Sequence, residues 1–171
     1  WGMFHEFGHN YQMSAWSAVY GTETTVNIFS LHAQEQLFGN SRLVDSGTYA
    51  SAIALLNNPA VTNKWTTADA FQKLVFIDQL RLGFPDLDWG FWQEVMRRYR
   101  AMTSTEYNAL NTNALKYDKF MTIACDVTSS NLTPHFDIWT IPVSQTAKHY
   151  CATKPALTRQ IWLIDNAKPL W

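Results

Sequence analysis

The chain has 171 residues, of which 47% are hydrophobic, so it is long enough to bury the core of one domain. Its formal net charge of −1 gives no basic stripe, which argues against nucleic acid or an anionic membrane surface as a partner. The sequence has no uncharged apolar stretch of about 18 residues, so it predicts no membrane span.

The hydrophobic pattern of the first third of the chain predicts helices separated by short loops. We expect a helix over Gly2–Ser14, a loop over Trp16–Gly21 and a second helix over Thr22–Phe38, whose first residue is the N-cap. Gly39 should end this second helix in the left-handed conformation that glycine favours. A short helix over Tyr49–Leu56 follows.

The middle of the chain carries two more helical segments. A strongly periodic segment begins after Thr66 or Thr67, either of which is a suitable N-cap, and Gly83-Phe84-Pro85 ends it. Asp88 starts the next helix. The apolar face of that helix consists of Phe91, Trp92, Val95, Met96 and Tyr99.

The last third of the chain is helical at first and ambiguous at its end. We expect a helix over Asn113–Asp126, and Thr133-Pro134 is typical of an N-cap followed by proline at the first helical position. The tail over Lys154–Trp171 has no clear pattern, and Arg159–Ile164 is a candidate strand. Because there is no internal repeat and no other convincing alternating run, the sequence predicts a mainly α fold.

A short motif near the start of the chain has the spacing of a catalytic zinc site. Residues 5–9 read His-Glu-Phe-Gly-His, and on a helix His5 and His9 lie one above the other on the same face. They can bind one metal ion from one side, while Glu6 beside them can reach a water bound to that ion. Zinc lowers the pKa of such a water toward ~7, and the carboxylate accepts its proton as it attacks a carbonyl.

A catalytic zinc needs a third protein ligand and one open coordination position. The metzincin form is excluded, because Gln12 and Ala15 occupy the positions that would hold glycine and a third histidine. Glu23 fits the other form, a glutamate from a second helix, and Asn27 on the same helical face can hold a ligand side chain as an outer partner. The alternatives are that Glu23 is only an acid favoured by the helix dipole and that Asn27 is a solvated polar residue.

Two regions of the chain match patterns of a known peptidase family. Residues 1–12 (WGMFHEFGHNYQ) fit W-G-x-x-H-E-x-G-H-x-x-Q, and residues 23–28 (ETTVNI) fit the E-x-x-x-N that follows it. Residues 131–144 (NLTPHFDIWTIPVS) are similar to D-L-T-P-F-F-x-x-W-G-I-P-V-S. Three positions depart from this last pattern without touching the metal motif: Asn131, His135 and Thr140. The chain therefore resembles the enhancin and mucin-directed zinc peptidases, which are gluzincins.

The resemblance covers about residues 1–150 and implies a chemistry. It implies that zinc is the cofactor and that His5, His9 and Glu23 hold it. Glu6 is then the general base, in agreement with the spacing argument. The implied substrate is a protein or glycoprotein, in particular O-glycosylated mucin, and the implied setting is secreted or at the cell surface.

The same resemblance implies an architecture. In gluzincins the cleft lies between a sheet-bearing N-terminal half and a helical C-terminal half. Residues 1–150 are therefore expected to be the helical part, with the metal helix at its N-terminus, and residues 151–171 a C-terminal extension. Because the chain opens inside the motif, we expect a fragment that lacks the sheet half, leaves apolar surface at Phe4 and Phe7 uncovered, and is a weak enzyme alone or none.

Two pairs of residues suggest structural links. Cys125 and Cys151 bracket the second matching region, and they are either a disulfide, if the protein is secreted, or two buried thiols. Asp78 lies inside an apolar helix stripe with Arg81 nearby, which indicates a satisfied ion pair rather than chemistry.

Other ionisable residues offer weaker candidates. A carbonyl under attack needs a hydrogen-bond donor, and Tyr11, Tyr20, Tyr49 and His135 are all possible in this role. His32 is expected to point away from the metal.

Two functions remain open at this level. The first is a zinc endopeptidase, and the second is a binding or regulatory domain that keeps the metallopeptidase fold without turnover. Glu6 favours the enzyme, because a pure scaffold has no need of the base.

Overall fold

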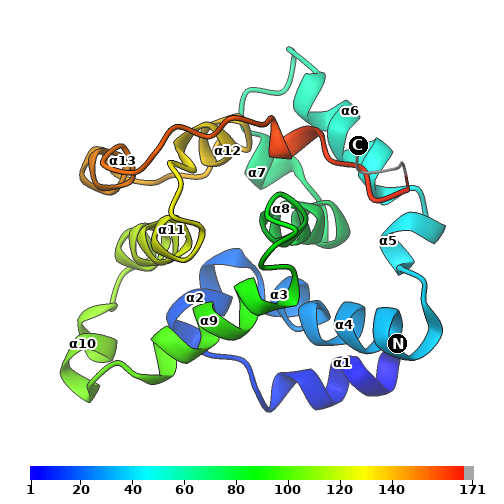
Figure 1. Ribbon diagram of the computed structural model, residues 1–171, viewed down its shortest axis with the longest axis horizontal. Helices are drawn as coiled ribbons and strands as arrows, with labels where there is room; N and C mark the ends of the chain where they lie inside the picture. Colours follow the sequence, from blue (N-terminus) through cyan, green and yellow to red (C-terminus); the bar gives the residue numbers. More distant parts are fainter. Residues whose placement is uncertain (168–171) are drawn as a thin grey trace.

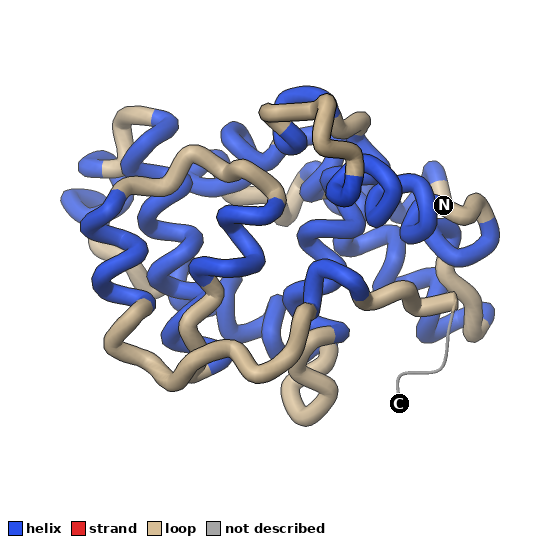
Figure 2. Tube along the Cα trace, turned by 90° about the horizontal axis from the view of Figure 1, so that it is seen from above, coloured by secondary structure: helices blue, strands red, loops and turns tan. Residues whose placement is uncertain are grey.

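The computed structural model describes residues 1–167 and is mainly helical, which confirms the predicted fold class; residues 168–171 of the ambiguous tail lie outside the described residues. Figure 2 shows helices joined by loops, and the described part has no strand beyond an isolated parallel bridge between Asn131 and Ala156. No helix in this part has the length and apolarity that a membrane crossing needs.

The helices are α1 (Gly2–His9), α2 (Ser14–Tyr20), α3 (Thr22–Thr25), α4 (Asn27–Phe38), α5 (Arg42–Asp45), α6 (Thr48–Asn57), α7 (Lys64–Thr67), α8 (Ala70–Leu82), α9 (Trp89–Arg100), α10 (Ser104–Ala109), α11 (Asn113–Thr128), α12 (Thr133–Ile138), α13 (Gln145–Cys151) and the 3-10 helix η1 (Ile161–Leu163).

Helix α8 lies at the centre of the molecule. Figure 1 shows it end on, with α11, α12 and α13 to its left, α5 and α6 to its right, and α1 with α4 below. Every residue from Leu74 to Leu82 is buried, because α3, α4, α6, α9 and η1 all contact this helix. Its N-terminus is fixed by a capping box: the Asp69 side chain accepts from the backbone of Gln72, whose own side chain accepts from the Asp69 N–H.

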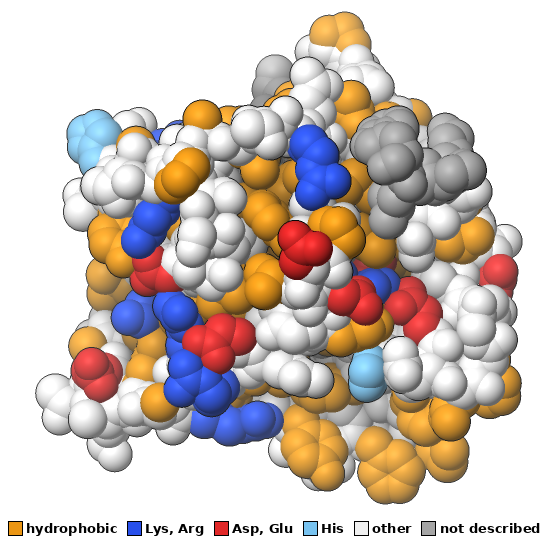
Figure 3. All heavy atoms as spheres, in the orientation of Figure 1, with side chains coloured by type: hydrophobic (Ala, Val, Ile, Leu, Met, Phe, Trp, Pro, Cys, Tyr) orange, Lys and Arg blue, Asp and Glu red, His pale blue; other side chains and the backbone are white. Residues whose placement is uncertain are grey.

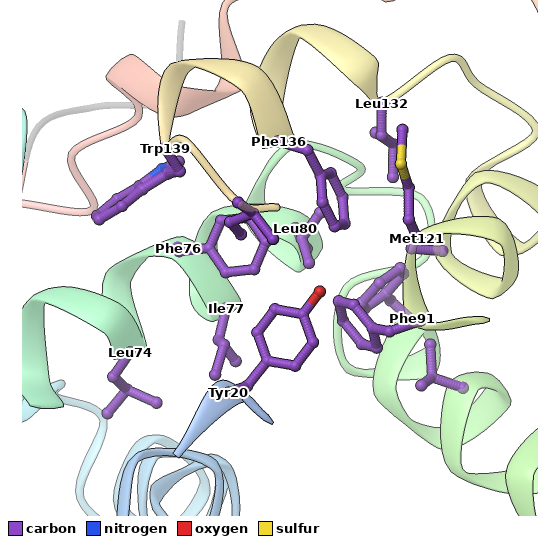
Figure 4. Packing of buried hydrophobic residues seen from close by; sticks show 14 of the residues in the cluster. Tyr20, Leu74, Phe76, Ile77, Leu80, Phe91, Met121, Leu132, Phe136 and Trp139 are labelled. Atoms are coloured by element: carbon purple, nitrogen blue, oxygen red, sulfur yellow. The ribbon is translucent and has the colours of Figure 1, made fainter. Parts of the chain in front are cut away.

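Aromatic rings from several helices fill the core around Phe76 of α8. Its ring stacks on Tyr20 at a centroid distance of 5.8 Å and on His135 at 4.7 Å. Phe136 and Trp139 contact it edge-on, at 5.3 and 5.8 Å. Figure 4 shows Tyr20, Phe76, Phe136 and Trp139 meeting in this cluster. The aromatic residues of the sequence therefore serve largely to build the core.

The predicted ion pair is present on α8. Arg81 Nε donates to Asp78 Oδ1 at 2.7 Å, and the same guanidinium binds Glu35 at 2.6 Å and Asp88 at 2.7 Å. Tyr49 donates to the other Asp78 oxygen. Burial alone would lower the pKa of Arg81, but the carboxylates of Asp78 and Glu35 outweigh it and hold that pKa above its usual value. The cluster is thus a satisfied structural network.

Two predictions for the N-terminal region are wrong. Helix α1 ends at His9, before the predicted Ser14, and the expected loop over Trp16–Gly21 is largely helix α2. The reason lies in tertiary packing, because Trp16 is 1% exposed and stacks on Trp92 at 5.6 Å. Burial of this large ring stabilises a helix whose sequence gives only a weak local signal.

The predicted second helix is interrupted at its start. Gly21, with φ of 91°, is its N-cap instead of Thr22, and Val26 separates α3 from α4. At this break the side-chain amide of Asn27 donates to the backbone oxygen of Glu23 at 2.8 Å. The interruption therefore coincides with the predicted ligand and its outer partner.

Most other helix predictions are confirmed. Gly39 ends α4 with φ of 69°, and α6, α9 and α11 cover the predicted segments with small differences at their ends. The predicted apolar face of α9 is buried throughout: Phe91, Trp92, Val95, Met96 and Tyr99.

The predicted caps of α8 and α12 are displaced. Thr66 and Thr67 lie within α7, and Asp69 caps α8 instead, since its carboxylate accepts from the first turn of that helix. In α12 the N-cap is Leu132, so Thr133-Pro134 are the first two helical residues.

The end of the described chain packs back on the helices. A disulfide joins Cys125 to Cys151, with a Cα–Cα distance of 5.7 Å, and decides between the two alternatives for these cysteines. Residues 159–164 contain η1 and not the candidate strand. Ile161 explains the difference, because it is fully buried and touches Gly83 so closely that a Cβ there would lie 2.7 Å from it.

Candidate metal centre

Helix α1 places the two histidines of the motif side by side. Their Nε2 atoms lie 3.3 Å apart, and their rings are perpendicular with centroids at 4.8 Å. The side chains of His5 and His9 are 19% and 31% exposed, so each ring is held by the protein and still reaches solvent. Both Nε2 atoms therefore converge on one point that is open on one side.

Gly8 lets α1 approach α4 closely enough to complete this site. It is the one residue of α1 that is buried. A Cβ at this position would lie 2.8 Å from Val26 Cγ2 and 3.0 Å from the backbone oxygen of Val26. Because backbone cannot yield cheaply, glycine is required here. The close approach brings Glu23, three residues before Val26, beside the histidines.

Glu23 is the third member of the group. Its Oε2 lies 3.2 Å from His5 Nε2, and its Oε1 lies 3.8 Å from His9 Nε2. The candidate ligand atoms all lie within 4.8 Å of one another, and no other group of His, Cys, Asp and Glu in residues 1–167 is arranged to hold a metal. The Glu23 side chain is 70% exposed. The structure thus brings together all three residues that the sequence singled out as ligands.

Asn27 holds His5 from behind. Its Oδ1 lies 2.8 Å from His5 Nδ1, while its Nδ2 donates to the backbone oxygen of Glu23. Since a carbonyl can only accept, the amide nitrogen must face Glu23 and the amide oxygen must face the imidazole. A neutral His5 therefore carries its proton on Nδ1 and presents the lone pair of Nε2 to the centre.

Gln12 does the same for His9, and sequence reasoning missed it. Its Oε1 lies 2.9 Å from His9 Nδ1, and its Nε2 donates to Thr22 O at 2.6 Å and to Thr25 Oγ1 at 2.8 Å. In the sequence Gln12 stood at the position where the metzincin form has glycine, and it was the last residue of the matched pattern W-G-x-x-H-E-x-G-H-x-x-Q. Its place in that pattern was a usable signal, although α1 ends at His9 and the helical spacing does not extend to Gln12.

The donor set fits a divalent cation such as zinc. Two imidazole lone pairs and a carboxylate face one another, with the imidazole protons on the far side of each ring. Such a group of acceptors can bind a divalent cation. Ligand atoms held at ~2.0–2.2 Å by a tetrahedral zinc lie roughly 3.3–3.5 Å apart. Here the two Nε2 atoms lie 3.3 Å apart, and the nearest Glu23 oxygen is Oε2 for His5 at 3.2 Å and Oε1 for His9 at 3.8 Å. With one oxygen of Glu23 as the ligand atom, the three ligand atoms lie within 4.8 Å of one another, a wider group than a bound zinc would hold.

The remaining predicted base stands free. Glu6 is exposed beside His5, and within the described residues no hydrogen bond or ion pair engages its carboxylate. His32 is exposed and rests edge-on against Trp89 at 4.7 Å, outside the metal group, as predicted. Of Glu6 and His32, only Glu6 is next to a candidate ligand, His5, and has a carboxylate that accepts no hydrogen bond within the described residues.

Burial removes three of the four candidate oxyanion donors. Tyr20, Tyr49 and His135 are at most 1% exposed. Burial raises the pKa of both tyrosines well above 10 and lowers the pKa of His135 to about 3. Tyr11 is 57% exposed, and its ring packs on Phe29 at 5.9 Å. Of the four, therefore, Tyr11 alone is accessible to a substrate.

Apolar side chains on α1 remain uncovered, as expected for Phe7 but not for Phe4. Met3 is 63% and Phe7 is 59% exposed, whereas Phe4 is half-buried. Met3 and Phe7 are four residues apart, and at ~100° per residue they lie on the opposite side of α1 from the two histidines. Figure 3 shows hydrophobic side chains gathered along the lower edge of the molecule, over α1.

Comparison with known proteins identifies the family. Residues 1–140 match the model of Peptidase M60, enhancin and enhancin-like proteins. The chain belongs to this family. The resemblance seen in the sequence is thus confirmed at the level of an enhancin-like peptidase family.

Similar proteins are longer than this chain. TRPM8 channel-associated factor homologs are 29% identical in Danio rerio, over 91% of this chain and 17% of the relative, and 25% identical in Xenopus laevis, over 98% and 18%. A crystal structure of a functionally unknown conserved protein from Bacillus anthracis has a TM-score of 0.84 and 30% identity over 99% of this chain. The chain spans 34% of that solved protein and under a fifth of the two curated relatives.

Proposed function

We propose that this chain is the metal-binding part of a zinc-dependent endopeptidase that hydrolyses peptide bonds in proteins or glycoproteins. His5, His9 and Glu23 hold the zinc. The observation that carries the proposal is the convergence of their acceptor atoms within 4.8 Å, with hydrogen bonds that keep both imidazole protons away from the centre. Membership of a peptidase family supports the proposal independently of the site geometry.

The residues of the centre have different roles in the proposed reaction. Zinc supplies Lewis acidity, which activates water and polarises the scissile carbonyl. Glu6 accepts a proton from the attacking water and returns it to the leaving amine, because its exposed carboxylate is beside a ligand and has no competing partner. Asn27 and Gln12 keep the imidazoles oriented while the charge at the centre changes.

The substrate class and setting follow from the family resemblance. We take O-glycosylated, mucin-like proteins as the substrates and a secreted or cell-surface enzyme as the setting. The disulfide between Cys125 and Cys151 supports this setting, since disulfides persist in oxidising compartments.

A second function is a binding domain without turnover. It is favoured by the names of the vertebrate relatives, which are channel-associated factors and not peptidases. In that case the domain docks on a membrane channel protein or a similar partner, and the metal stabilises its fold. Glu6 separates the two functions, because docking makes no use of a general base.

The test combines metal analysis with cleavage. The purified chain should hold one zinc per molecule. A form of the protein extended upstream of Trp1, which supplies the sheet half expected for this family, should cut a glycosylated mucin faster than its deglycosylated form. Glu6→Gln should retain zinc, since Gln is nearly isosteric and Glu6 is not a ligand. Turnover in that variant should fall by at least ~10²-fold, the scale of a lost general base.

The outcomes separate the two functions. Zinc binding by the extended form without any cleavage favours the binding domain. Cleavage that continues unchanged in Glu6→Gln contradicts the proposed role of Glu6, and a chain that binds no zinc contradicts the metal centre itself.

A further inference from the structure

Gln12 occupies the turn after α1 and joins two elements of the metal centre. On one side its Oε1 meets His9 Nδ1 at 2.9 Å. On the other side its Nε2 donates to Thr22 O and Thr25 Oγ1, the residues on either side of Glu23 in α3. Both ends of one amide are therefore engaged, each with a different ligand-bearing segment.

The partners of Gln12 fix the orientation of its amide. Thr22 O is a carbonyl and can only accept, and the Thr25 hydroxyl already donates to Gly21 O at 3.0 Å. Turning the amide over would set its oxygen against two acceptors. The amide oxygen consequently faces His9, which must donate through Nδ1 and keep Nε2 free of its proton.

The distances show why this matters for the site as a whole. His5 lies within hydrogen-bonding distance of both other ligands, at 3.2 Å from Glu23 and 3.3 Å from His9. His9 and Glu23 are the loosest pair, at 3.8 Å. Gln12 is the residue that links them, through the backbone and hydroxyl beside Glu23.

We propose that Gln12 is a positioning residue of the metal centre. It sets the tautomer of His9 and ties that ring to α3, so that the site is assembled before a metal arrives. This inference rests on the proposed zinc site for its functional meaning. Gln12 touches neither substrate nor metal, and it acts through His9.

The first test measures the tautomer directly in the metal-free, 171-residue chain. Long-range ¹H–¹⁵N NMR of the neutral imidazole should show His9 protonated on Nδ1. Gln12→Met keeps the side-chain length and removes both hydrogen bonds, so His9 should shift toward the Nε2–H form. Gln12→Glu should restore the Nδ1–H form, since a carboxylate oxygen accepts that proton, but it should not restore the link to α3, because its second oxygen cannot donate to Thr22 O.

The second test measures zinc affinity by competition with a chromogenic chelator. Gln12→Met should bind zinc about 10–100-fold more weakly, the range seen when an outer partner of a ligand is lost. Gln12→Glu should bind more tightly than Gln12→Met. Asn10→Ala is the matched control, because this exposed amide contacts only the Phe7 backbone. Its affinity should match the natural chain.

Specific results would overturn the inference. An unchanged His9 tautomer in Gln12→Met does so, even if zinc affinity falls, because Gln12 would then act only by supporting the fold. If the natural chain binds no zinc, the proposed function fails, but the tautomer measurement still decides the role of Gln12.

Discussion

The candidate metal centre lies on an exposed helix edge, whereas the core around Phe76 is closed to solvent. Glu23 is 70% exposed, and α1 has one buried residue, Gly8. Phe76 and the rings around it are fully buried. The centre is held by polar hydrogen bonds from amides, and the core is held by packed aromatic rings.

The two regions therefore affect different free energies: the core affects unfolding, and the candidate centre affects metal binding. Apolar burial at α8 supplies stability, since each buried large side chain contributes about 1.5–3 kcal/mol. The three exposed candidate ligands contribute little to the free energy of unfolding. Their acceptor atoms face one another, which favours metal binding. Substitutions in the core should therefore change the free energy of unfolding, and substitutions at the centre should change metal affinity.

The largest effect is expected from Phe76→Ala. Removing a fully buried ring at the centre of the cluster should lower the free energy of unfolding by about 3–5 kcal/mol. Zinc affinity of the folded protein should stay nearly constant, as measured by titration below the unfolding transition. Phe71→Ala is the matched control, because it lies on the same helix and is only half-buried. An equal loss in both variants would contradict the central role of the Phe76 cluster.

Glu23→Ala tests the other side of the comparison. Zinc affinity should fall by more than ~10²-fold, because loss of a ligand exceeds the loss of an outer partner. The free energy of unfolding of the metal-free chain should change by less than about 0.5 kcal/mol, as is usual at exposed sites. Retention of full zinc affinity would remove Glu23 from the ligand set.

Gly8→Ala links the two regions and should have an intermediate effect. The new Cβ meets the Val26 backbone at 3.0 Å and pushes α1 away from α4. We expect a loss of about 1–3 kcal/mol in the free energy of unfolding. Zinc affinity should fall as the histidines move from Glu23. Gly2→Ala is the control, since nothing lies within 4 Å of a Cβ there. Equal behaviour of the two variants would show that α1 tolerates the shift.

The sequence predicts the centre better than it predicts the region around it. Two histidines four residues apart, with a base between them, follow from helix periodicity alone. The end of α1 does not, because Gln12 leaves the helix to bond with Thr22 across the turn. Helix α2 escaped prediction for a similar reason, since Trp16 is stabilised by rings distant in sequence.

Caps and tertiary contacts explain the other differences. Asp69 offered the same kind of cap as Thr66 and Thr67, and only its pairing with Gln72 selected it. The segment around Ile161 is shaped by its contact with Gly83. Local sequence patterns contain no information about such long-range partners, which is why helix α2 and the caps of α8 and α12 were not predicted.

The smallest effect at neutral pH is expected from His135→Phe. His135 stacks on Phe76, and its Nδ1 has no hydrogen-bond partner within the described residues. Phenylalanine keeps the ring and removes that buried polar atom, at the loss of one hydrogen bond from Nε2 to the Phe76 backbone. The free energy of unfolding at pH 7 should rise by about 1 kcal/mol.

Acid pH should enlarge this difference. Burial lowers the pKa of His135 to about 3, below the unfolded value of about 6.5, so the unfolded chain binds the extra proton between these values. His135 therefore lowers the free energy of unfolding as pH falls from about 6.5 toward 3, by up to roughly 1.4 kcal/mol per pH unit. Denaturant unfolding at pH 7 and 4.5 should show a smaller loss in the free energy of unfolding for His135→Phe than for the natural chain. Parallel pH profiles for the natural chain and His135→Phe would mean that this histidine is not the group that senses acid.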